Sequence, residues 1–207
     1  MRAEVVIARY REALDWAVGL PYPVVIYNHM PPEEDCPLLD GGKGPLPDNW
    51  TRIGLAPNIG REAHCYLTHI LGRWESLADR TAFLQGDALA GPHIIGVGEI
   101  GAALKGAEPV RVLGDALACG ADGGGGIKDM DGAAMDLAAA HELILGAPFP
   151  GTVKFPVGAQ MVVSRDAILA RPREVYERAL GYVKTEPTAA WVLERLWLEI
   201  FKTEGAE

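Results

Sequence analysis

The residues whose types and spacing point most clearly to chemistry lie in two segments, 57–70 and 81–87. The first places Gly60 and Arg61 at the start of a helical pattern, and the second ends in one carboxylate, Asp87. The amino end of a helix attracts anions, because its first N–H groups are unpaired and the helix dipole is positive there. A carboxylate after a strand lies at the edge of an α/β sheet where ligands bind. The two segments therefore predict a site for a phosphate-bearing ligand.

Composition limits the class of protein. With 207 residues and 49% hydrophobic content, the chain can bury a full core as one domain. The net charge of -9 disfavours nonspecific nucleic-acid binding, which needs clustered Lys and Arg. No segment approaches the ~18 apolar residues of a membrane span and the start lacks a secretory pattern, so we expect a cytoplasmic protein. The spacing of Cys36, Cys65 and Cys119 predicts free thiols.

The first half of the chain alternates apolar runs with helical patterns. In order, the predicted elements are a strand over 4–9, a helix over 11–18, a strand over 24–28, a helix over 59–74 and a strand over 81–85. This alternation is typical of a parallel sheet with crossover connections. Several Pro and Gly residues predict a long irregular loop over 31–56.

The second half is less regular. The glycine-rich run 120–126 lies within residues 96–150, which we interpret as an insertion or lid. The elements predicted after that run are a helix over 131–145, a strand over 158–164 with Ser164 as a helix cap, and helices over 173–183 and 189–201.

Several segments together resemble the family catalogued as domain of unknown function 3431, which is itself remotely similar to GT-A-type glycosyltransferases. The segments that carry the resemblance are Val5–Tyr10, Ile26–Asn28, Asn58–Ala63, Phe83–Asp87, Gly158–Arg165 and Leu193–Trp197. The resemblance covers nearly the whole chain, interrupted mainly at 31–56 and 96–150. It implies one GT-A-like, Rossmann-related α/β domain over residues 1–207, with a mostly parallel central sheet flanked by helices. It also implies transfer of a sugar from a nucleotide-sugar donor to an unknown acceptor.

The resemblance further implies which residues meet the ligands, because GT-A enzymes hold the nucleotide sugar over the carboxyl ends of the first strands. The donor contacts expected in this chain are Arg9, Tyr10, Asn28, Gly60, Arg61, Gln85 and Asp87. The acceptor contacts are expected from Gly158, Gln160 and the glycine-rich insertion. Asn28 could touch a nucleobase or ribose, or could only end its strand through an Asx turn.

GT-A enzymes hold a divalent metal, Mg²⁺ or Mn²⁺, on an Asp-x-Asp motif, and the metal stabilises the departing nucleotide. At the equivalent position, residues 85–87 are Gln-Gly-Asp, so an amide replaces one carboxylate. The metal site could be weaker, could be completed by His93, or could be absent with Arg9 or Arg61 supplying the positive charge. Asp87 could also be only a turn residue.

The carboxylate expected to act as catalytic base is Glu194, at the edge of the apolar stripe of the last predicted helix. Inverting sugar transfer needs a carboxylate that takes the proton of the acceptor hydroxyl. Glu194 could instead form a salt bridge that ties this helix to the sheet. In the same way, Arg61 could pair with Glu62 or Glu12 instead of binding phosphate.

One motif supports a different class of enzyme. Gly96, Gly98 and Gly101 fit the dinucleotide-binding fingerprint, which would indicate an NAD(P)-dependent oxidoreductase. The helix that follows is limited by Pro109, whereas a crossover needs roughly ten to twelve residues or more. A third possibility is a protein of the same fold that binds nucleotide or carbohydrate without catalysis.

Two further motifs are weaker. Asp129-Met130-Asp131 is a literal Asp-x-Asp, but it precedes a helical pattern in which Asp131 suits an N-cap. His141-Glu142 begins like a zinc-protease motif and lacks its second histidine.

Overall fold

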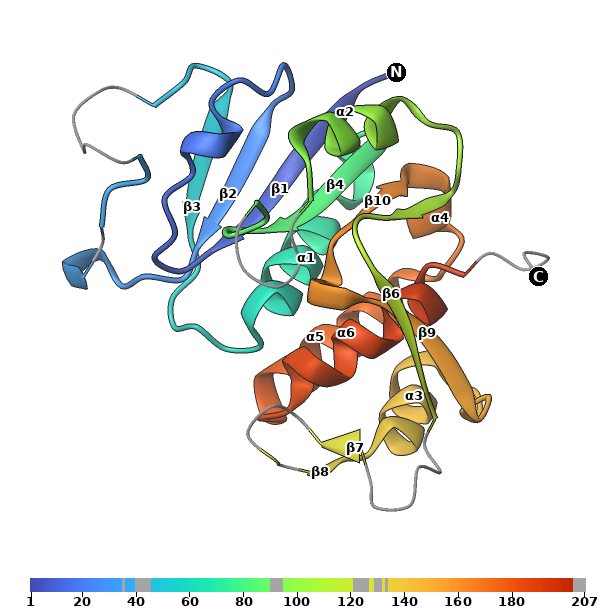
Figure 1. The fold of residues 1–207 in the computed structure, drawn as a ribbon. Coiled ribbons are helices and arrows are strands. Elements are labelled where there is room, and N and C mark those ends of the chain that lie inside the picture. Colours follow the sequence, from blue (N-terminus) through green and yellow to red (C-terminus); the bar gives the residue numbers. More distant parts are fainter. Residues whose placement is uncertain are drawn as a thin grey trace.

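A six-stranded sheet forms the centre of the computed structural model, which describes residues 1–34, 36–39, 46–89, 95–120, 127–128, 132 and 134–202 (Figure 1). The strands, in spatial order, are β3 (Trp50–Gly54), β2 (Val24–Asn28), β1 (Ala3–Arg9), β4 (Arg80–Gln85), β10 (Met161–Ser164) and β5 (Val110–Val112). The pairs among β3, β2, β1 and β4 are parallel, and β10 is antiparallel to both of its neighbours. The predicted mixed α/β fold with a mostly parallel central sheet is therefore confirmed.

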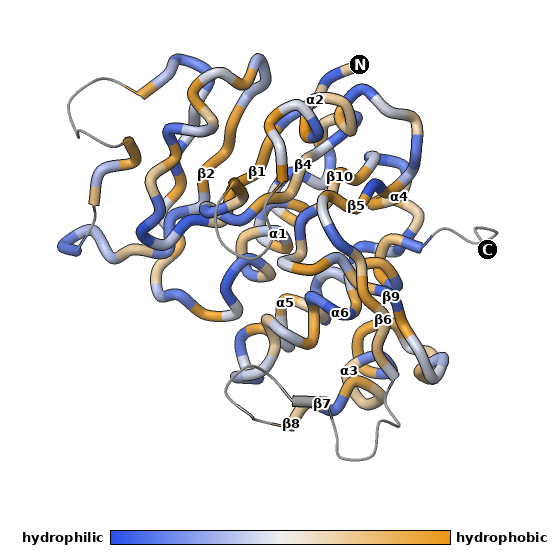
Figure 2. Tube along the Cα trace, viewed as in Figure 1, coloured by the Kyte–Doolittle hydropathy of each residue, from blue (hydrophilic) through white to orange (hydrophobic). Residues whose placement is uncertain are grey.

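Helices cover both faces of the sheet. The hydrophobic core on one face contains side chains of α1 (Arg61–Gly72), α4 (Arg165–Leu169), α5 (Arg173–Thr185) and α6 (Ala189–Ile200), and α3 (Leu137–Leu145) joins it by packing on α5 and α6. The other face packs against η1 (Asp15–Ala17) and α2 (Val97–Lys105). Alternate side chains of β1 enter the two cores, because successive residues of a strand point to opposite faces. The central strands are accordingly among the most apolar parts of the trace (Figure 2).

Smaller elements complete the fold. An antiparallel ribbon of β6 (Ala116–Gly120) and β9 (Thr152–Pro156) lies beside α6. The remaining elements are β7 (Ile127–Lys128), β8 (Ala134–Met135), η2 (Pro32–Glu34), η3 (Trp74–Ser76) and η5 (Val157–Ala159).

The structure corrects two predictions in the first half. The helix predicted over 11–18 is reduced to η1, because the Leu14 N–H donates to the Leu38 carbonyl rather than to a helical one. The irregular loop predicted over 31–56 is wrong for its last part, which forms β3. This edge strand buries Trp50 and leaves most of its other residues exposed, so it lacks the apolar run that marks β1, β2 and β4.

The second half differs from prediction at element boundaries. The helix predicted over 131–145 begins at Leu137, where the Asp136 carboxylate accepts a hydrogen bond from the Ala139 N–H, and Asp131 lies outside the described residues. The strand predicted from residue 158 begins at Met161, because η5 precedes it. Ser164 caps α4 as predicted.

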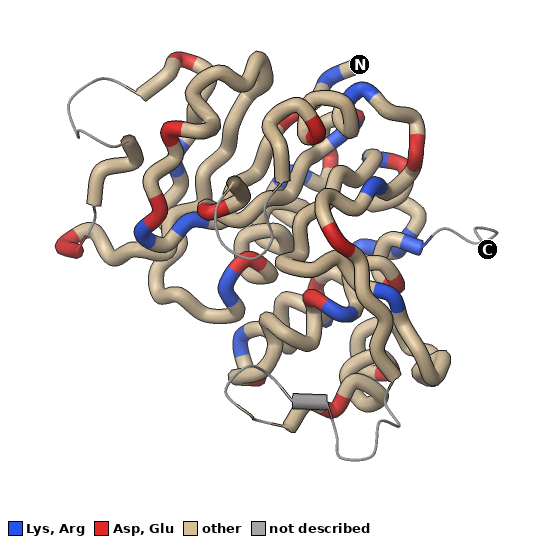
Figure 3. Tube along the Cα trace, viewed as in Figure 1, with Lys and Arg blue, Asp and Glu red and all other residues tan. Residues whose placement is uncertain are grey.

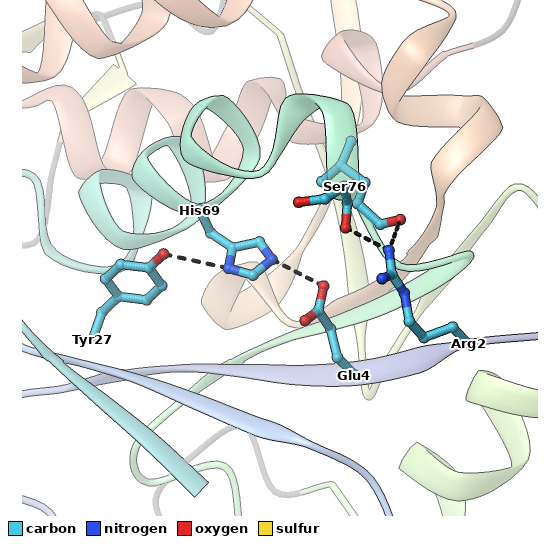
Figure 4. Close-up of polar contacts among 6 residues, drawn as sticks. Arg2, Glu4, Tyr27, His69 and Ser76 are labelled. Carbon is cyan, nitrogen blue, oxygen red and sulfur yellow. Dashed lines mark hydrogen bonds and ion pairs between the residues drawn. The ribbon is translucent and has the colours of Figure 1, made fainter. Parts of the chain in front are cut away.

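A buried polar chain fixes α1 to the sheet (Figure 4). His69 of α1 is fully buried, with Nε2 3.1 Å from Glu4 Oε1 and Nδ1 3.4 Å from the Tyr27 hydroxyl oxygen. Burial raises the pKa of Glu4, but the hydrogen bond with His69 and nearby positive charge outweigh it, so this pKa is lowered. Arg2 donates to the carbonyl oxygens of Ser76 and Leu77 nearby. These bonds set the position of α1 against β1 and β2.

Acidic and basic residues are interspersed along the trace (Figure 3). Among the described residues, no helix combines the length and the apolar character needed to cross a membrane. Cys36, Cys65 and Cys119 are free thiols, as predicted.

Candidate functional site

A pocket of about 410 Å³ opens where β1 and β4 end. The register pairs Ala8 with Gln85 and Arg9 with Asn28, so the carboxyl ends of these parallel strands meet at one edge. The pocket is lined by Ala8, Arg9, Tyr10, Glu12, His29, Asn58, Arg61, Glu62, Gln85, Gly86 and Asp87. The order β3-β2-β1-β4 reverses direction between β1 and β4, and open α/β sheets bind ligands at such a switch point.

The start of α1 forms one wall of the pocket with an unusual backbone. Gly60 and Arg61 have φ values of 59° and 47°, both in the left-handed region. A Cβ at Gly60 would overlap the side chain of Val183, so both the conformation and the close approach require glycine. A non-glycine residue at positive φ, such as Arg61, is strained, and strain of this kind clusters at ligand sites.

The Arg61 side chain lies over the ring of Trp191, with its guanidinium carbon 4.4 Å from the ring centroid. It pairs with neither Glu62 nor Glu12, the two partners that the sequence left open. Within the part of the chain that the structure describes, the guanidinium makes no hydrogen bond or ion pair. The stack therefore positions the exposed Arg61 side chain in the lining of the pocket.

Glu62, the second residue of α1, is buried in the wall beside Arg61 and is 8% exposed. Burial raises its pKa to about 7, and the charge of Glu194 adds to the shift. Its own backbone N–H, Arg61 and a hydrogen bond with Gln85 act in the opposite direction. A carboxyl group that titrates near neutral pH in a pocket can exchange protons with a ligand.

Arg9 forms the floor of the pocket. Its Nε donates to the Glu12 carbonyl, and its two terminal nitrogens donate to Asn28 Oδ1 at 2.6 Å and to the carbonyls of Cys36 and Pro37 at 3.0 Å. Arg9 therefore contributes positive potential while its donors are used by the protein. Asn28 is 1% exposed, contacts Arg9 and does not line the pocket.

Gln85, Gly86 and Asp87, at and just after the end of β4, also line the pocket. Glu12 accepts from the N–H groups of Tyr10 and Arg11 at 2.6 and 3.1 Å, and its carboxylate would overlap a Cβ at Gly86. Glycine at this position therefore lets the Glu12 side chain lie against the backbone after β4.

The predicted metal ligands are only partly described. Asp87 lines the pocket, and His93 lies outside the described residues. The part of the chain that the structure describes contains no group of three His, Cys, Asp or Glu side chains arranged to hold a metal ion. Mg²⁺ and Mn²⁺ do not need such a group, because Mg²⁺ in particular keeps several waters and binds substrate phosphates with one or two carboxylates. Asp87 therefore fits a shared protein–ligand metal site and does not form one alone.

The residues predicted for catalysis and for the acceptor lie elsewhere. Glu194 Oε1 accepts from the Gly158 N–H at 2.7 Å, and Oε2 lies 3.3 Å from Arg195 Nη1. Gln160 is 1% exposed. None of the residues Gly158, Gln160 and Glu194 lines the pocket. In this position Glu194 anchors η5 to α6 through the backbone.

His29 is a pocket residue that the sequence analysis missed. Its Nδ1 lies 2.8 Å from the Leu55 carbonyl, and its Nε2 lies 3.0 Å from the Arg61 carbonyl and 2.9 Å from Cys65 Sγ. Burial lowers the pKa of His29, and it raises that of the Cys65 thiol. The ring connects the end of β2 to the strained start of α1. The signal available in the sequence was a polar residue directly after a strand.

Of the remaining motifs, the structure describes the glycine fingerprint and His141. Gly101, whose counterpart in the dinucleotide fingerprint allows close helix–strand packing, would place a Cβ in open space. Asp129 and Asp131 lie outside the described residues. His141, in the middle of α3, is buried, and its Nδ1 lies 2.8 Å from the carbonyl of Ala147 just after the helix, which explains it as a core histidine.

A family model described as "Protein of unknown function (DUF3431)" matches residues 127–207. The part of the chain from α3 to α6 is therefore similar to a family whose function is unknown. The resemblance that the sequence indicated over nearly the whole chain is shown for this part. No curated protein and no solved structure matches the chain.

Proposed function

We propose that the pocket binds a nucleotide-sugar donor and that the protein is a glycosyltransferase acting on an acceptor hydroxyl. The observation that carries the proposal is Arg61. It has a strained backbone, its guanidinium is stacked on Trp191 with no acidic partner among the described residues, and it lines a pocket at the switch point of the sheet. An arginine presented in this way suits a diphosphate, which its planar fork can bind through two N–H groups.

The other pocket residues suit the rest of such a ligand. Tyr10, Asn58 and Gln85 are polar residues of the kind that hydrogen-bond the hydroxyl groups of a sugar or ribose. A pocket of about 410 Å³ lies within the range of small-ligand sites. Asp87 would hold Mg²⁺ or Mn²⁺ together with the diphosphate, and the metal would supply charge stabilisation for the departing nucleotide.

A non-catalytic nucleotide- or carbohydrate-binding protein is the second candidate. The amide of Gln85 favours it, because it stands where an Asp-x-Asp motif would supply a carboxylate. Both candidates predict binding of the same ligands, and only the first predicts turnover.

Calorimetric titration with UDP, GDP, UDP-glucose and GDP-mannose, each with and without Mn²⁺, tests the proposal. We expect binding of at least one nucleotide and none of NAD(H). Arg61→Ala should weaken that binding about tenfold to a hundredfold, since a charge-assisted hydrogen bond contributes about 1.5–3 kcal/mol. Arg173→Ala is a matched control, because Arg173 also lies over a tryptophan, Trp74, outside the pocket. No binding of any of these nucleotides, or equal losses in the two variants, would reject the proposal.

A further inference from the structure

Glu62 is a buried carboxylate in the pocket, and packing alone does not explain its position. It is more than nine-tenths buried, and it lies between Arg61 on its own helix and Gln85 on β4. Buried carboxylates normally have a cationic partner at ion-pair distance, because burial of a charge is costly. Within the described residues, Glu62 has no such ion pair, and Arg61 is stacked on Trp191 instead.

The groups around Glu62 come from α1, β4 and α6. On α1 they are Arg61, the Cys65 thiol and the Tyr66 hydroxyl, and the last two are neutral because burial and the Glu62 charge raise their pKa values. From α6, Glu194 adds a second negative charge. These surroundings favour a carboxyl group that can hold or lose a proton, with its pKa near neutral pH.

We propose that Glu62 is the catalytic base of this pocket and takes the proton of the acceptor hydroxyl; this inference rests on the proposed function. The acceptor oxygen forms a bond to the anomeric carbon of the donor sugar. The bond from that carbon to the diphosphate breaks, and its electron pair leaves on the diphosphate beside Arg61. The acceptor proton moves to the Glu62 carboxylate.

The contacts of Glu194 make it a weaker candidate for this role than Glu62. Its carboxylate accepts from the Gly158 N–H and from Arg195, and Glu194 does not line the pocket. It acts on the site by its charge, which disfavours ionised Glu62 and makes that carboxylate a stronger base. The two acidic residues therefore differ in task because they differ in environment.

The test uses the full chain with UDP-glucose and GDP-mannose in the presence of Mn²⁺, and water serves as the acceptor. Nucleotide release measures turnover, and calorimetric titration measures donor affinity separately. We expect Glu62→Gln to lower release at saturating donor by ~10²–10⁴ while donor affinity is kept or improved. The turnover number of the wild type should rise with pH around neutrality, and the residual rate of Glu62→Gln should not. Glu62→Asp keeps the acid, and its rate should lie between those two.

Glu174→Gln is the matched control, because Glu174 also lies in the first turn of a helix, α5, but is exposed. It should release nucleotide at the wild-type rate. Donor binding with an unchanged rate in Glu62→Gln overturns the role of Glu62 and leaves the proposed function intact. If the wild type binds a donor but releases no nucleotide, the role of Glu62 is also overturned, and the protein is a binding protein. Failure of the wild type to bind either donor rejects the proposed function itself.

Discussion

Replacing Glu62 by glutamine should stabilise the folded protein at alkaline pH. The pKa of Glu62 is about 7 in the fold, compared with an ordinary value of 4.5. Between these values the folded state holds a proton that the unfolded state has lost, so the free energy of unfolding falls as the pH rises. At 1.36 kcal/mol per pH unit, the fall amounts to about 3 kcal/mol. The glutamine variant does not titrate, so its advantage should grow from near zero at pH 4.5 to about 3 kcal/mol at pH 8.

His64 produces the opposite dependence over nearly the same pH range. Burial lowers its pKa to about 4 from an ordinary value of 6.5. The unfolded state therefore binds the extra proton between these values, and stability rises with pH by about 3 kcal/mol. His29, whose pKa burial also lowers, acts in the same direction as His64. The wild-type curve should accordingly change little between pH 4.5 and 6.5, whereas that of Glu62→Gln should climb.

Urea unfolding at pH 4.5, 5.5, 6.5 and 8 measures both curves. Glu174→Gln is again the control. Its free energy of unfolding should be at most about 1 kcal/mol below that of the wild type, and this difference should be the same at pH 6.5 and pH 8, because the Glu174 charge only supports a helix end. The reasoning is refuted if Glu62→Gln is less stable than the wild type at pH 8. That result would mean that ionised Glu62 supports the start of α1 as a structural anion.

Two further substitutions, one at the start of α1 and one within it, are tested by urea unfolding. Gly60→Ala should destabilise the fold by about 2–5 kcal/mol, through the left-handed backbone and the overlap with Val183. Gly146 has a φ of 71°, and a Cβ there would meet open space, so Gly146→Ala should lower the free energy of unfolding by only about 1–2 kcal/mol. Equal losses in the two variants would refute the effect of the overlap with Val183. His69→Leu should lose about 3–5 kcal/mol because Glu4 is left buried without its partner, and the double variant with Glu4→Leu should lose less. A double variant less stable than His69→Leu would contradict this account.

The sequence predicted the part of the fold that depends on local pattern. Three of the central strands, β1, β2 and β4, are short apolar runs, and their parallel order follows from the helices and turns between them. That order alone brings Arg9, Tyr10, Arg61, Gln85 and Asp87 to one edge of the sheet, where they line a pocket. Whether these residues bind a donor stays a prediction.

Features that depend on contacts distant in sequence could not be predicted in this way. The stack of Arg61 on Trp191 joins α1 to α6, and no spacing along the chain signals it. The sequence suggested Glu62 only as a possible partner of Arg61, because the burial of Glu62 comes from packing against other elements. Glu194 was assigned by its place on an apolar stripe, which shows the face of a helix and not what its carboxylate contacts.

The position of β10 has a consequence for synthesis of the chain. The strands from β3 to β4 can pair as soon as residues 1–85 have left the ribosome, since their partners are all near in sequence. In contrast, β5 pairs with β10 alone among the described strands, and β10 also covers the exposed edge of β4. A nascent chain that stops before Met161 therefore presents an open strand edge, which is a template for aggregation. The region matched by the family of unknown function contains β10, so this region supplies the strand that completes the central sheet.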